Sequence, residues 1–286
     1  MHLWRLPDRT LSIDQCPLVM GIVNVTPDSF SDGGQFDDRA AAVAHGLELA
    51  RQGADLLDVG GESTRPGAEP VPLEEELRRV VPVVEILAAQ IPVPVAVDTS
   101  KAEVARRCLA AGARIVNDVT ALQGDPAMAE VVRDSQPGVI LMHMQGTPAT
   151  MQLNPQYDNV VTDLRRFFEE RLHAAAAVGI ASDRIVLDPG IGFGKTGAHN
   201  LEILARLEEF QELGRPVCLG VSRKQIVRRL LGDRPVPRRL AGSVAILAYA
   251  LSRQAVQVVR VHDVEATRDL VTVFSALSGW RPPAGE

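Results

Sequence analysis

Residues 93–117 read VPVAVDTSKAEVARRCLAAGARIVN. The valine-rich start has the composition of a short buried strand, and residues 101–111 have that of an amphipathic helix. Between them, Ser100-Lys101-Ala102-Glu103 matches a capping box, in which Ser and Glu side chains bond the first free backbone N–H groups of a helix. Gly112 follows the helical run, where a helix end favours a residue with positive φ. The stretch therefore predicts one strand–loop–helix–glycine unit.

The same unit recurs along the chain. Short apolar runs stand at residues 18–23, 55–59, 93–97, 114–116, 139–142, 185–187, 217–221 and 256–259. Amphipathic stretches of helical length lie between most of them, at residues 39–52, 73–90, 101–111, 159–178 and 200–213. Gly53, Gly179 and Gly214 repeat the position of Gly112. Uninterrupted apolar runs are typical of parallel strands covered by helices, so eight units predict an α/β fold, a (β/α)8 TIM barrel.

The composition fits one domain over residues 1–286. The chain is 46% hydrophobic, and barrels of about 250 residues commonly form a single core. A short N-terminal hairpin that turns at Pro7-Asp8 is expected before the first strand of the barrel. No linker or low-complexity segment interrupts the sequence.

Charge and cysteine content narrow the class of protein. The net charge of −6 argues against binding to nucleic acid or to an anionic membrane surface, which depends on clustered Lys and Arg. No apolar stretch reaches the roughly 20 residues of a membrane span, and the N-terminus lacks the apolar core of a signal peptide. Cys16, Cys108 and Cys218 are far apart and match no metal-binding pattern. We expect a reduced, cytoplasmic enzyme.

Polar residues follow nearly every expected strand. They are Asn24, the run Gly60-Gly61-Glu62-Ser63-Thr64-Arg65, Asp98, Asn117-Asp118, His143, Asp188, Ser222-Arg223-Lys224, Arg260 and His262. In a (β/α)8 barrel the carboxyl ends of the strands converge on one face, where active sites lie. One such residue is often only a cap or a turn, but the same feature on eight strands predicts an active site there.

Two groups of side chains define the chemistry expected at this face. Asp98, Asn117 and Asp188 suit a flat heterocycle with adjacent N–H and NH2 groups, because a carboxylate can accept two parallel hydrogen bonds. A divalent-metal cluster to which Asn24 adds an oxygen is the alternative for these residues. The second group, Arg65, Lys224, Arg260 and His262, indicates an anion such as a phosphate or diphosphate.

Three loops complete the expected site. The segment Asp188-Pro-Gly-Ile-Gly-Phe-Gly-Lys195-Thr196 is no P-loop, because Pro189 occupies the place of the first glycine, and it lacks the Rossmann spacing. Its glycines let the backbone approach a flat ligand, with Phe193 near the ligand face. Residues 24–34 and 60–67 have the polar, glycine-ended composition of lids. No Ser/His/Asp or Cys/His arrangement is evident, so covalent hydrolysis is unsupported.

Taken together, these blocks resemble the dihydropteroate synthase family of the folate pathway. The matching stretches are GIVNVTPDSFSDGG from Gly21, DVGGESTRPGA from Asp58, VDTSK from Val97, NDV from Asn117, LMHMQGTP from Leu141, LDPGIGFGK from Leu187, SRK from Ser222 and RVHDV from Arg260. They run in the family's order from Gly21 to Val264, and eight co-linear motifs are far more specific than any one of them.

The resemblance implies a homodimeric (β/α)8 transferase, a sulfonamide target that joins 6-hydroxymethyl-7,8-dihydropterin diphosphate to 4-aminobenzoate with Mg2+. The expected products are 7,8-dihydropteroate and diphosphate. By motif, the pterin would contact Asp98, Asn117, Met142, Asp188, Phe193 and Lys224. The diphosphate would contact Asn24, Arg65, Arg260 and His262, with Asn24 as the protein ligand of Mg2+. The aminobenzoate would contact Phe30, Thr64, Arg65, Pro66, Lys224 and Gln225.

The resemblance also implies a mechanism. Diphosphate leaves first, stabilised by Mg2+, Arg260 and His262; Asp98 stabilises positive charge on the pterin, and the aromatic amine then attacks the methylene carbon. Asp32, on the lid, and Lys224 complete the expected catalytic set. One departure concerns the residue after SRK, usually Ser in the family and Gln225 here, which predicts altered affinity for aminobenzoate or sulfonamides.

Two other functions compete with this one. A methyltetrahydrofolate-dependent corrinoid methyltransferase would share the barrel and the carboxylate–amide pterin site, but it would not need the cationic rim or the SRK and RVHDV blocks. A catalytically silent pterin-binding homologue is supported only by Gln225, and both lid motifs argue against it. Turnover by the purified protein separates the silent homologue from an enzyme.

Overall fold

The computed structural model describes residues 3–13, 16–26 and 35–279, and the side chains of residues 35–38 are not described. A hairpin of β1 (Leu3–Arg5) and β2 (Thr10–Ser12) precedes the barrel. The barrel strands are β3 (Leu18–Asn24), β4 (Leu56–Gly60), β5 (Val95–Asp98), β6 (Ile115–Asp118), β7 (Gly138–Met142), β8 (Ile185–Asp188), β9 (Cys218–Leu219) and β10 (Val258–Val261).

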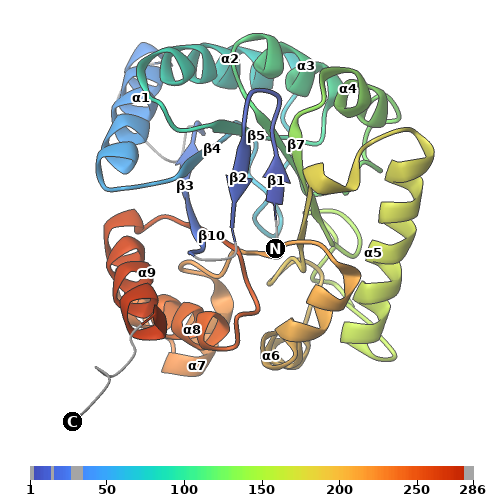
Figure 1. Ribbon diagram of the computed structural model, residues 1–286, viewed down its shortest axis with the longest axis vertical. Helices are drawn as coiled ribbons and strands as arrows, with labels where there is room; N and C mark the ends of the chain where they lie inside the picture. Colours follow the sequence, from blue (N-terminus) through green and yellow to red (C-terminus); the bar gives the residue numbers. More distant parts are fainter. Residues whose placement is uncertain (1–2, 14–15, 27–34, 280–286) are drawn as a thin grey trace.

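The eight barrel strands pair in parallel in the order β8-β7-β6-β5-β4-β3-β10-β9. A parallel bridge between Leu187 and Val217 joins the two ends of this order. The ring of helices in Figure 1 surrounds these strands. The predicted (β/α)8 barrel with its N-terminal hairpin is therefore confirmed.

The helices that cover the barrel are α1 (Gln35–Arg51), α2 (Leu73–Gln90), α3 (Ala102–Ala110), α4 (Met128–Ser135), α5 (Val160–Ala177), α6 (Gly197–Ala205), α7 (Gln225–Leu231), α8 (Leu240–Ser252) and α9 (Val264–Gly279). Short 3-10 turns add η2 (Ser182–Arg184), η3 (Leu207–Leu213) and η4 (Val236–Arg238). The predicted positive φ is found at the four glycines that follow helical runs, with values of 94°, 114°, 92° and 67° at Gly53, Gly112, Gly179 and Gly214.

The predicted capping box at Ser100 is wrong. Helix α3 has Lys101 as its N-cap, and no side-chain hydrogen bond forms there. Instead, the backbone N–H of Ala102 donates to Oδ2 of Asp125 at 2.9 Å. A carboxylate from the loop after β6 therefore caps the start of α3 in place of the local serine that the sequence pattern predicted.

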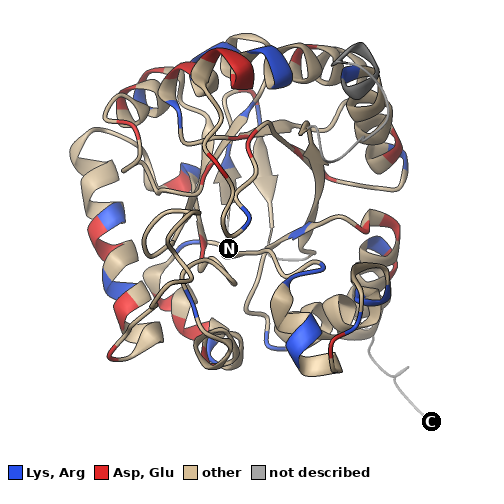
Figure 2. Ribbon diagram, turned by 180° about the vertical axis from the view of Figure 1, so that it is seen from behind, with Lys and Arg blue, Asp and Glu red and all other residues tan. Residues whose placement is uncertain are grey.

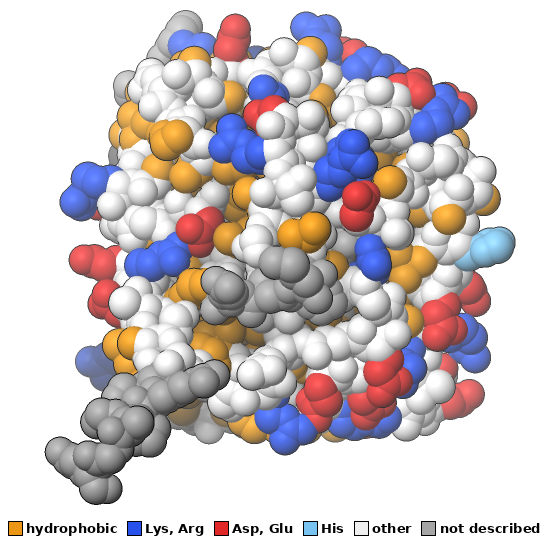
Figure 3. Space-filling model, viewed as in Figure 1, with side chains coloured by type: hydrophobic (Ala, Val, Ile, Leu, Met, Phe, Trp, Pro, Cys, Tyr) orange, Lys and Arg blue, Asp and Glu red, His pale blue; other side chains and the backbone are white. Residues whose placement is uncertain are grey.

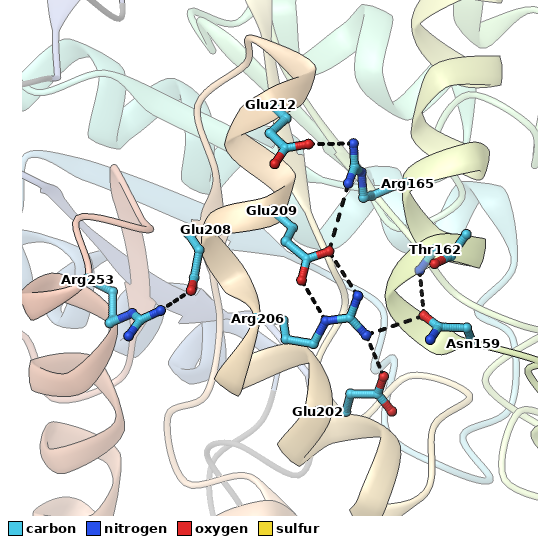
Figure 4. Close-up of polar contacts among 9 residues, drawn as sticks. All are labelled: Asn159, Thr162, Arg165, Glu202, Arg206, Glu208, Glu209, Glu212 and Arg253. Carbon is cyan, nitrogen blue, oxygen red and sulfur yellow. Dashed lines mark hydrogen bonds and ion pairs between the residues drawn. The ribbon is translucent and has the colours of Figure 1, made fainter.

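The stretch 200–213, predicted as one helix, is broken at Arg206. Helix α6 begins earlier, at a capping box between Thr196 and His199, and the 3-10 turn η3 follows Arg206. The Arg206 guanidinium spans the break, with bonds to Glu202 at 2.8 Å and to Glu209 at 2.6 and 2.9 Å (Figure 4). Periodicity did not reveal the break because apolar residues continue through it.

The interior of the barrel is sealed at the amino ends of its strands by the hairpin (Figure 1). Trp4 is fully buried, and its Nε1–H donates to the carbonyl oxygen of Arg184 at 2.8 Å. It packs with Leu6 and Ile13 on inward-facing residues such as Met20 and Ile115. Charged side chains of both signs are interspersed over this closed face (Figure 3). The opposite, carboxyl end of the barrel is the one left for a site.

Within the residues that the structure describes, no helix is both long enough and apolar enough to span a membrane. All three cysteines are free thiols, with Cys108 and Cys218 buried and Cys16 partly exposed.

Candidate active site

Strand register aligns the expected site residues at the carboxyl end of the barrel, the face turned toward the viewer in Figure 2. Asn24 lies beside Gly60 on the next strand, and Gly60 lies beside Asp98. Asp98 in turn lies beside Asn117, and farther round the barrel Met142 pairs with Asp188. Parallel pairing thus gathers residues separated by more than 160 positions into one rim.

Arg260 is the centre of this rim. Its Nε donates to Oδ2 of Asp58 at 2.5 Å, and its Nη2 donates to Oδ2 of Asp98 at 2.8 Å. The strand β10 begins and ends two residues later than the predicted run 256–259, so Arg260 lies within the strand rather than beyond it. Arg260 is thereby held across the barrel by carboxylates from β4 and β5.

Asp58 is the main residue that the sequence analysis missed. It is fully buried on β4, and the amide Nδ2 of Asn117 also donates to its Oδ2, at 3.0 Å. Its other oxygen, Oδ1, has no hydrogen-bond partner among the described residues. The available signal was an aspartate in the middle of the apolar run 55–59, where a charged residue needs a partner.

Burial and neighbouring charges shift the pKa values of the residues in this cluster. Burial raises the pKa of Asp98 to about 7; Arg260 counteracts the rise and Asp58 adds to it. Burial opposes the charge on Arg260, but the two aspartates raise its pKa above the ordinary value. Near neutral pH the cluster therefore holds a permanent cation beside a carboxyl group that is only partly ionised.

A second group lies at the ends of β8 and β9. Asp188 accepts a hydrogen bond from the backbone N–H of Gly190 at 2.7 Å, and burial raises its pKa. Lys224 donates to the carbonyl oxygen of Ile191 at 2.7 Å and stands 4.6 Å from the ring centre of Phe193. Burial lowers the pKa of Lys224 to about 8, against the attraction of Asp188. Met142 is buried beside them.

His262 differs from the cation that the sequence analysis expected. Burial, together with Arg223 and Arg260, lowers its pKa to about 4, so the ring is neutral near pH 7. Its Nδ1 lies 3.1 Å from Oγ of Ser222, and its backbone N–H donates to the same oxygen at 3.2 Å. His262 is therefore a neutral hydrogen-bonding group in the free protein.

The residues expected around the second substrate lie on the rim. Arg65 and Pro66 are exposed, Thr64 is partly buried, and Gln225 is the exposed first residue of α7. Phe30 and Asp32 lie outside the described residues. The structure thus places four of these residues at loops and helix starts on the open end of the barrel.

Both ends of the loop that carries Thr64 and Arg65 are held by contacts with other segments. Lys101 forms ion pairs with Glu62, at the start of the loop, and with buried Glu76 on α2. Near the other end, the backbone N–H of Gly67 donates to Pro148 O at 3.1 Å. The stem of the loop is therefore fixed while its tip remains exposed.

The alternative of a metal cluster gains no support. Among the residues that the structure describes, no group of three or more His, Cys, Asp or Glu side chains could hold a metal ion. Asp98 and Asp58 instead share Arg260. The carboxylates are thus engaged in an ion-pair cluster, and Asn24 stands as a separate oxygen at the end of β3.

Comparison with known proteins agrees with this geometry. The model of the family described as pterin binding enzyme matches residues 20–262. The chain belongs to this family. Dihydropteroate synthase of Escherichia coli K12 is 46% identical over 260 residues, which cover 91% of each chain. The enzyme of Neisseria meningitidis serogroup B is 45% identical over 281 residues, 96% of this chain and 98% of the relative.

Solved structures of pterin-binding enzymes share the whole fold. Dihydropteroate synthase of Xanthomonas albilineans with 4-aminobenzoic acid superimposes with a TM-score of 0.91 at 50% identity, covering 98% of this chain and 99% of that one. The Yersinia pestis enzyme in a sulfonamide complex gives a TM-score of 0.91 at 45% identity, covering 97% and 100%. This chain is therefore a family member along nearly its full length.

The cluster predicts that Asp58 contributes to the raised pKa of Asp98. An Asp58→Asn substitution removes a negative charge that raises the pKa of Asp98, so this pKa should fall below about 7. Carboxylate signals of isotopically labelled protein, followed by NMR or infrared spectroscopy across pH, measure the shift. Asp134→Asn, which removes an exposed partner of Arg133, is the control and should leave Asp98 unchanged. A pKa of Asp98 that stays constant or rises in Asp58→Asn would contradict the assignment.

Proposed function

We propose that this chain is a dihydropteroate synthase. It condenses 6-hydroxymethyl-7,8-dihydropterin diphosphate with 4-aminobenzoate and releases 7,8-dihydropteroate and diphosphate. The observation that carries the proposal is the placement of Arg260 and the carboxylates Asp98 and Asp188 in one barrel mouth, in a chain 50% identical to a dihydropteroate synthase solved with 4-aminobenzoic acid.

The pterin ring would lie in the part of the mouth lined by Asp188, Asn117 and Met142. A carboxylate can accept both the ring N–H and the adjacent amino group of a pterin. Asp188 is fixed for this by the Gly190 N–H, and Asn117 by its bond to Asp58. Phe193 and the Lys224 ammonium beside it supply a ring face and a donor on one side. These residues bind and orient the heterocycle.

The diphosphate would lie toward Arg260, with Arg65 and His262 at the rim. Arg260 stays charged because two carboxylates hold it, so it can stabilise the negative charge that grows on diphosphate as the C–O bond breaks. Neutral His262 can donate a hydrogen bond to a phosphate oxygen. The exposed Arg65 can reach over the mouth once both substrates are present.

Asp98 would stabilise the positive charge that spreads into the pterin after the C–O bond breaks. Its effect requires the ionised form, and burial raises its pKa to about 7 in the free protein. The neutral amine of 4-aminobenzoate then attacks the methylene carbon and forms the C–N bond. The resulting ammonium is a strong acid and releases its proton without a strong base. Thr64, Pro66 and Gln225 would border this second substrate, together with Phe30 and Asp32.

Mg2+ fits the donor set at the end of β3. Magnesium is commonly held by one or two protein oxygens and several phosphate and water oxygens rather than by a complete protein cage. The side-chain oxygen of Asn24 is a suitable ligand, and Asn24 ends β3, the strand that pairs with the strand of Arg260. When bound, Mg2+ would neutralise charge on the departing diphosphate.

We also propose a cytoplasmic homodimer. Helix α8 is apolar along most of its length, and its Leu240 and Tyr249 side chains are 37% and 45% exposed. Val273 and Leu277 on the neighbouring α9 are 58% and 71% exposed. Exposed apolar side chains on two adjacent helices favour burial against a second copy. Sedimentation equilibrium at micromolar concentration should give twice the monomer mass, and the monomer mass alone would contradict the dimer.

Turnover tests the proposed reaction. Purified protein with pterin diphosphate and Mg2+ should release diphosphate in a manner that depends on 4-aminobenzoate. Asp98→Ala should lower the rate by at least about 100-fold, because it removes a charge that stabilises the transition state. Asp134→Ala, on the far end of α4, is the control and should keep the wild-type rate.

The pH profile refines this test. In the wild type, kcat/KM for the pterin substrate should rise with pH through about 7, because Asp98 must lose its proton to act. Asp98→Asn should lose this rise together with most activity. If the protein binds pterin but releases no diphosphate, the silent homologue is favoured. Turnover with methyltetrahydrofolate and a corrinoid protein would favour the methyltransferase.

Gln225 should affect how tightly the second substrate, 4-aminobenzoate, binds. Its exposed amide lies next to Lys224 and can donate to the aminobenzoate carboxylate. Gln225→Ser should change the KM for 4-aminobenzoate and the inhibition by sulfonamides by roughly 2- to 12-fold, the range of one hydrogen bond. Gln90→Ser, at the last residue of α2, is the control. If neither quantity moves in Gln225→Ser, Gln225 does not contact the aminobenzoate.

A further inference from the structure

The loop between β8 and α6 is held by side chains along its whole length. Four successive carbonyl oxygens, those of residues 191–194, each accept a hydrogen bond from a different side chain. The donors are Lys224 to Ile191 at 2.7 Å, Gln152 to Gly192 at 2.7 Å, Lys195 to Phe193 at 2.9 Å and Tyr157 to Gly194 at 2.7 Å. A loop rich in glycine would be mobile without such bonds, and here its backbone is fixed.

Close packing fixes the same loop on its inner side. A Cβ atom added at Gly190, whose φ is 66°, would lie 2.0 Å from the carbonyl oxygen of His143. One added at Gly194 would lie 2.6 Å from the carbonyl oxygen of Gln145. The loop therefore lies directly against the segment that follows β7, and only glycine permits this approach.

Lys195 joins these two segments from within. It is only 2% exposed, and its Nζ also donates to the carbonyl oxygen of His143 at 3.2 Å and lies 3.0 Å from Nδ1 of His143. Burial lowers the pKa of Lys195 well below its ordinary value, and burial with Lys195 nearby lowers that of His143 to about 2. The amine of Lys195 thus contacts two carbonyl oxygens and a ring nitrogen on the two segments at once.

The held loop positions two residues that contact pterin in the proposed function, Asp188 at the end of β8 and Phe193 on the loop itself. Its Gly190 N–H fixes Asp188, and Phe193 presents its ring beside Lys224. Gln152 and Tyr157 come from the β7–α5 connection, and each bonds a carbonyl group of the loop backbone. Their effect on a ligand would therefore pass through the loop backbone.

We propose that Gln152, Tyr157 and Lys195 are positioning residues that pre-form the pterin-binding wall by holding the carbonyl groups of residues 192–194. The inference rests on the proposed function. A wall fixed before the ligand arrives saves the entropy of ordering the loop, so loss of a holding bond weakens pterin binding. Of the residues proposed for 4-aminobenzoate, Lys224 contacts this loop at Ile191 and Phe193 rather than through the three positioning residues, so we expect its affinity to change much less.

The test uses three variants of the full-length protein. Gln152→Ala removes an exposed side chain and Tyr157→Phe removes one hydroxyl, so both leave the core packing intact. Lys195→Met removes the buried amine. Each variant is titrated calorimetrically with 6-hydroxymethyl-7,8-dihydropterin, and the KM of each substrate and kcat are measured. The control is Thr150→Ala, an exposed change in the same β7–α5 connection whose bonds stay with Thr147.

The expected result is selective. Gln152→Ala and Tyr157→Phe should each raise the pterin dissociation constant by roughly 2- to 12-fold, the range of one hydrogen bond. Lys195→Met should raise it further. The KM for 4-aminobenzoate should stay within about twofold of wild type in the two surface variants, and Thr150→Ala should match wild type throughout.

Two outcomes would overturn the inference. One is unchanged pterin affinity in both Gln152→Ala and Tyr157→Phe. The other is an equal rise in the KM of both substrates, which indicates general destabilisation rather than positioning. If the wild-type protein binds no pterin, both the proposed function and this inference are overturned. If it binds pterin without turnover, the proposed function fails, but the pterin affinities of the variants still test the positioning role.

Discussion

The ion-pair cluster of Arg260 with Asp58 and Asp98 is the constraint on which the rest of the site depends. Breaking a buried ion pair by removing one partner leaves an uncompensated charge and is strongly destabilising, by about 3–5 kcal/mol. The barrel avoids this by bringing β4, β5 and β10 together so that one guanidinium meets two carboxylates. Asp58 also accepts a bond from Asn117, and burial raises the pKa of Asp98 to about 7 while Arg260 opposes the rise. The cluster therefore contributes both to the geometry of the site and to its electrostatics.

Two rigid parts of the structure, the N-terminal hairpin and the glycine loop after β8, lie around this cluster. The hairpin seals the amino end of the barrel with Trp4, which leaves only the carboxyl end open. The glycine loop after β8 is held by side chains of the β7–α5 connection and by the buried Lys195. Most residues proposed for the diphosphate and the pterin thus lie on strands or on the held loop, whereas Arg65, Pro66 and Gln225, which are proposed for 4-aminobenzoate, are exposed. This division suits an enzyme in which the pterin is placed first and the second substrate is enclosed later.

Much of this arrangement was predictable from the sequence, for identifiable reasons. The repeating unit and its glycines determine the barrel, and parallel pairing then brings Asn24, Asp98 and Asn117 to one rim. Long-range partners were not predictable: Asp125 in place of Ser100 at the start of α3, and Asp58 beneath Arg260. The neutral state of His262 also escaped prediction, because it depends on burial and on nearby Arg223 and Arg260. Local sequence patterns thus predict the strands, the helices and the polar residues at the strand ends. The long-range partners and the charge states depend on three-dimensional packing.

A double-mutant cycle between Asp58→Asn and Arg260→Gln measures how strongly these two buried groups interact. The free energy of unfolding of the wild type, both single variants and the double variant is measured by urea denaturation. If Arg260 is held by Asp58, the two substitutions are strongly coupled, and the double variant is less destabilised than the sum of the single variants by about 1–3 kcal/mol. Effects that add to within about 0.5 kcal/mol would show that the two residues act independently and would contradict the account.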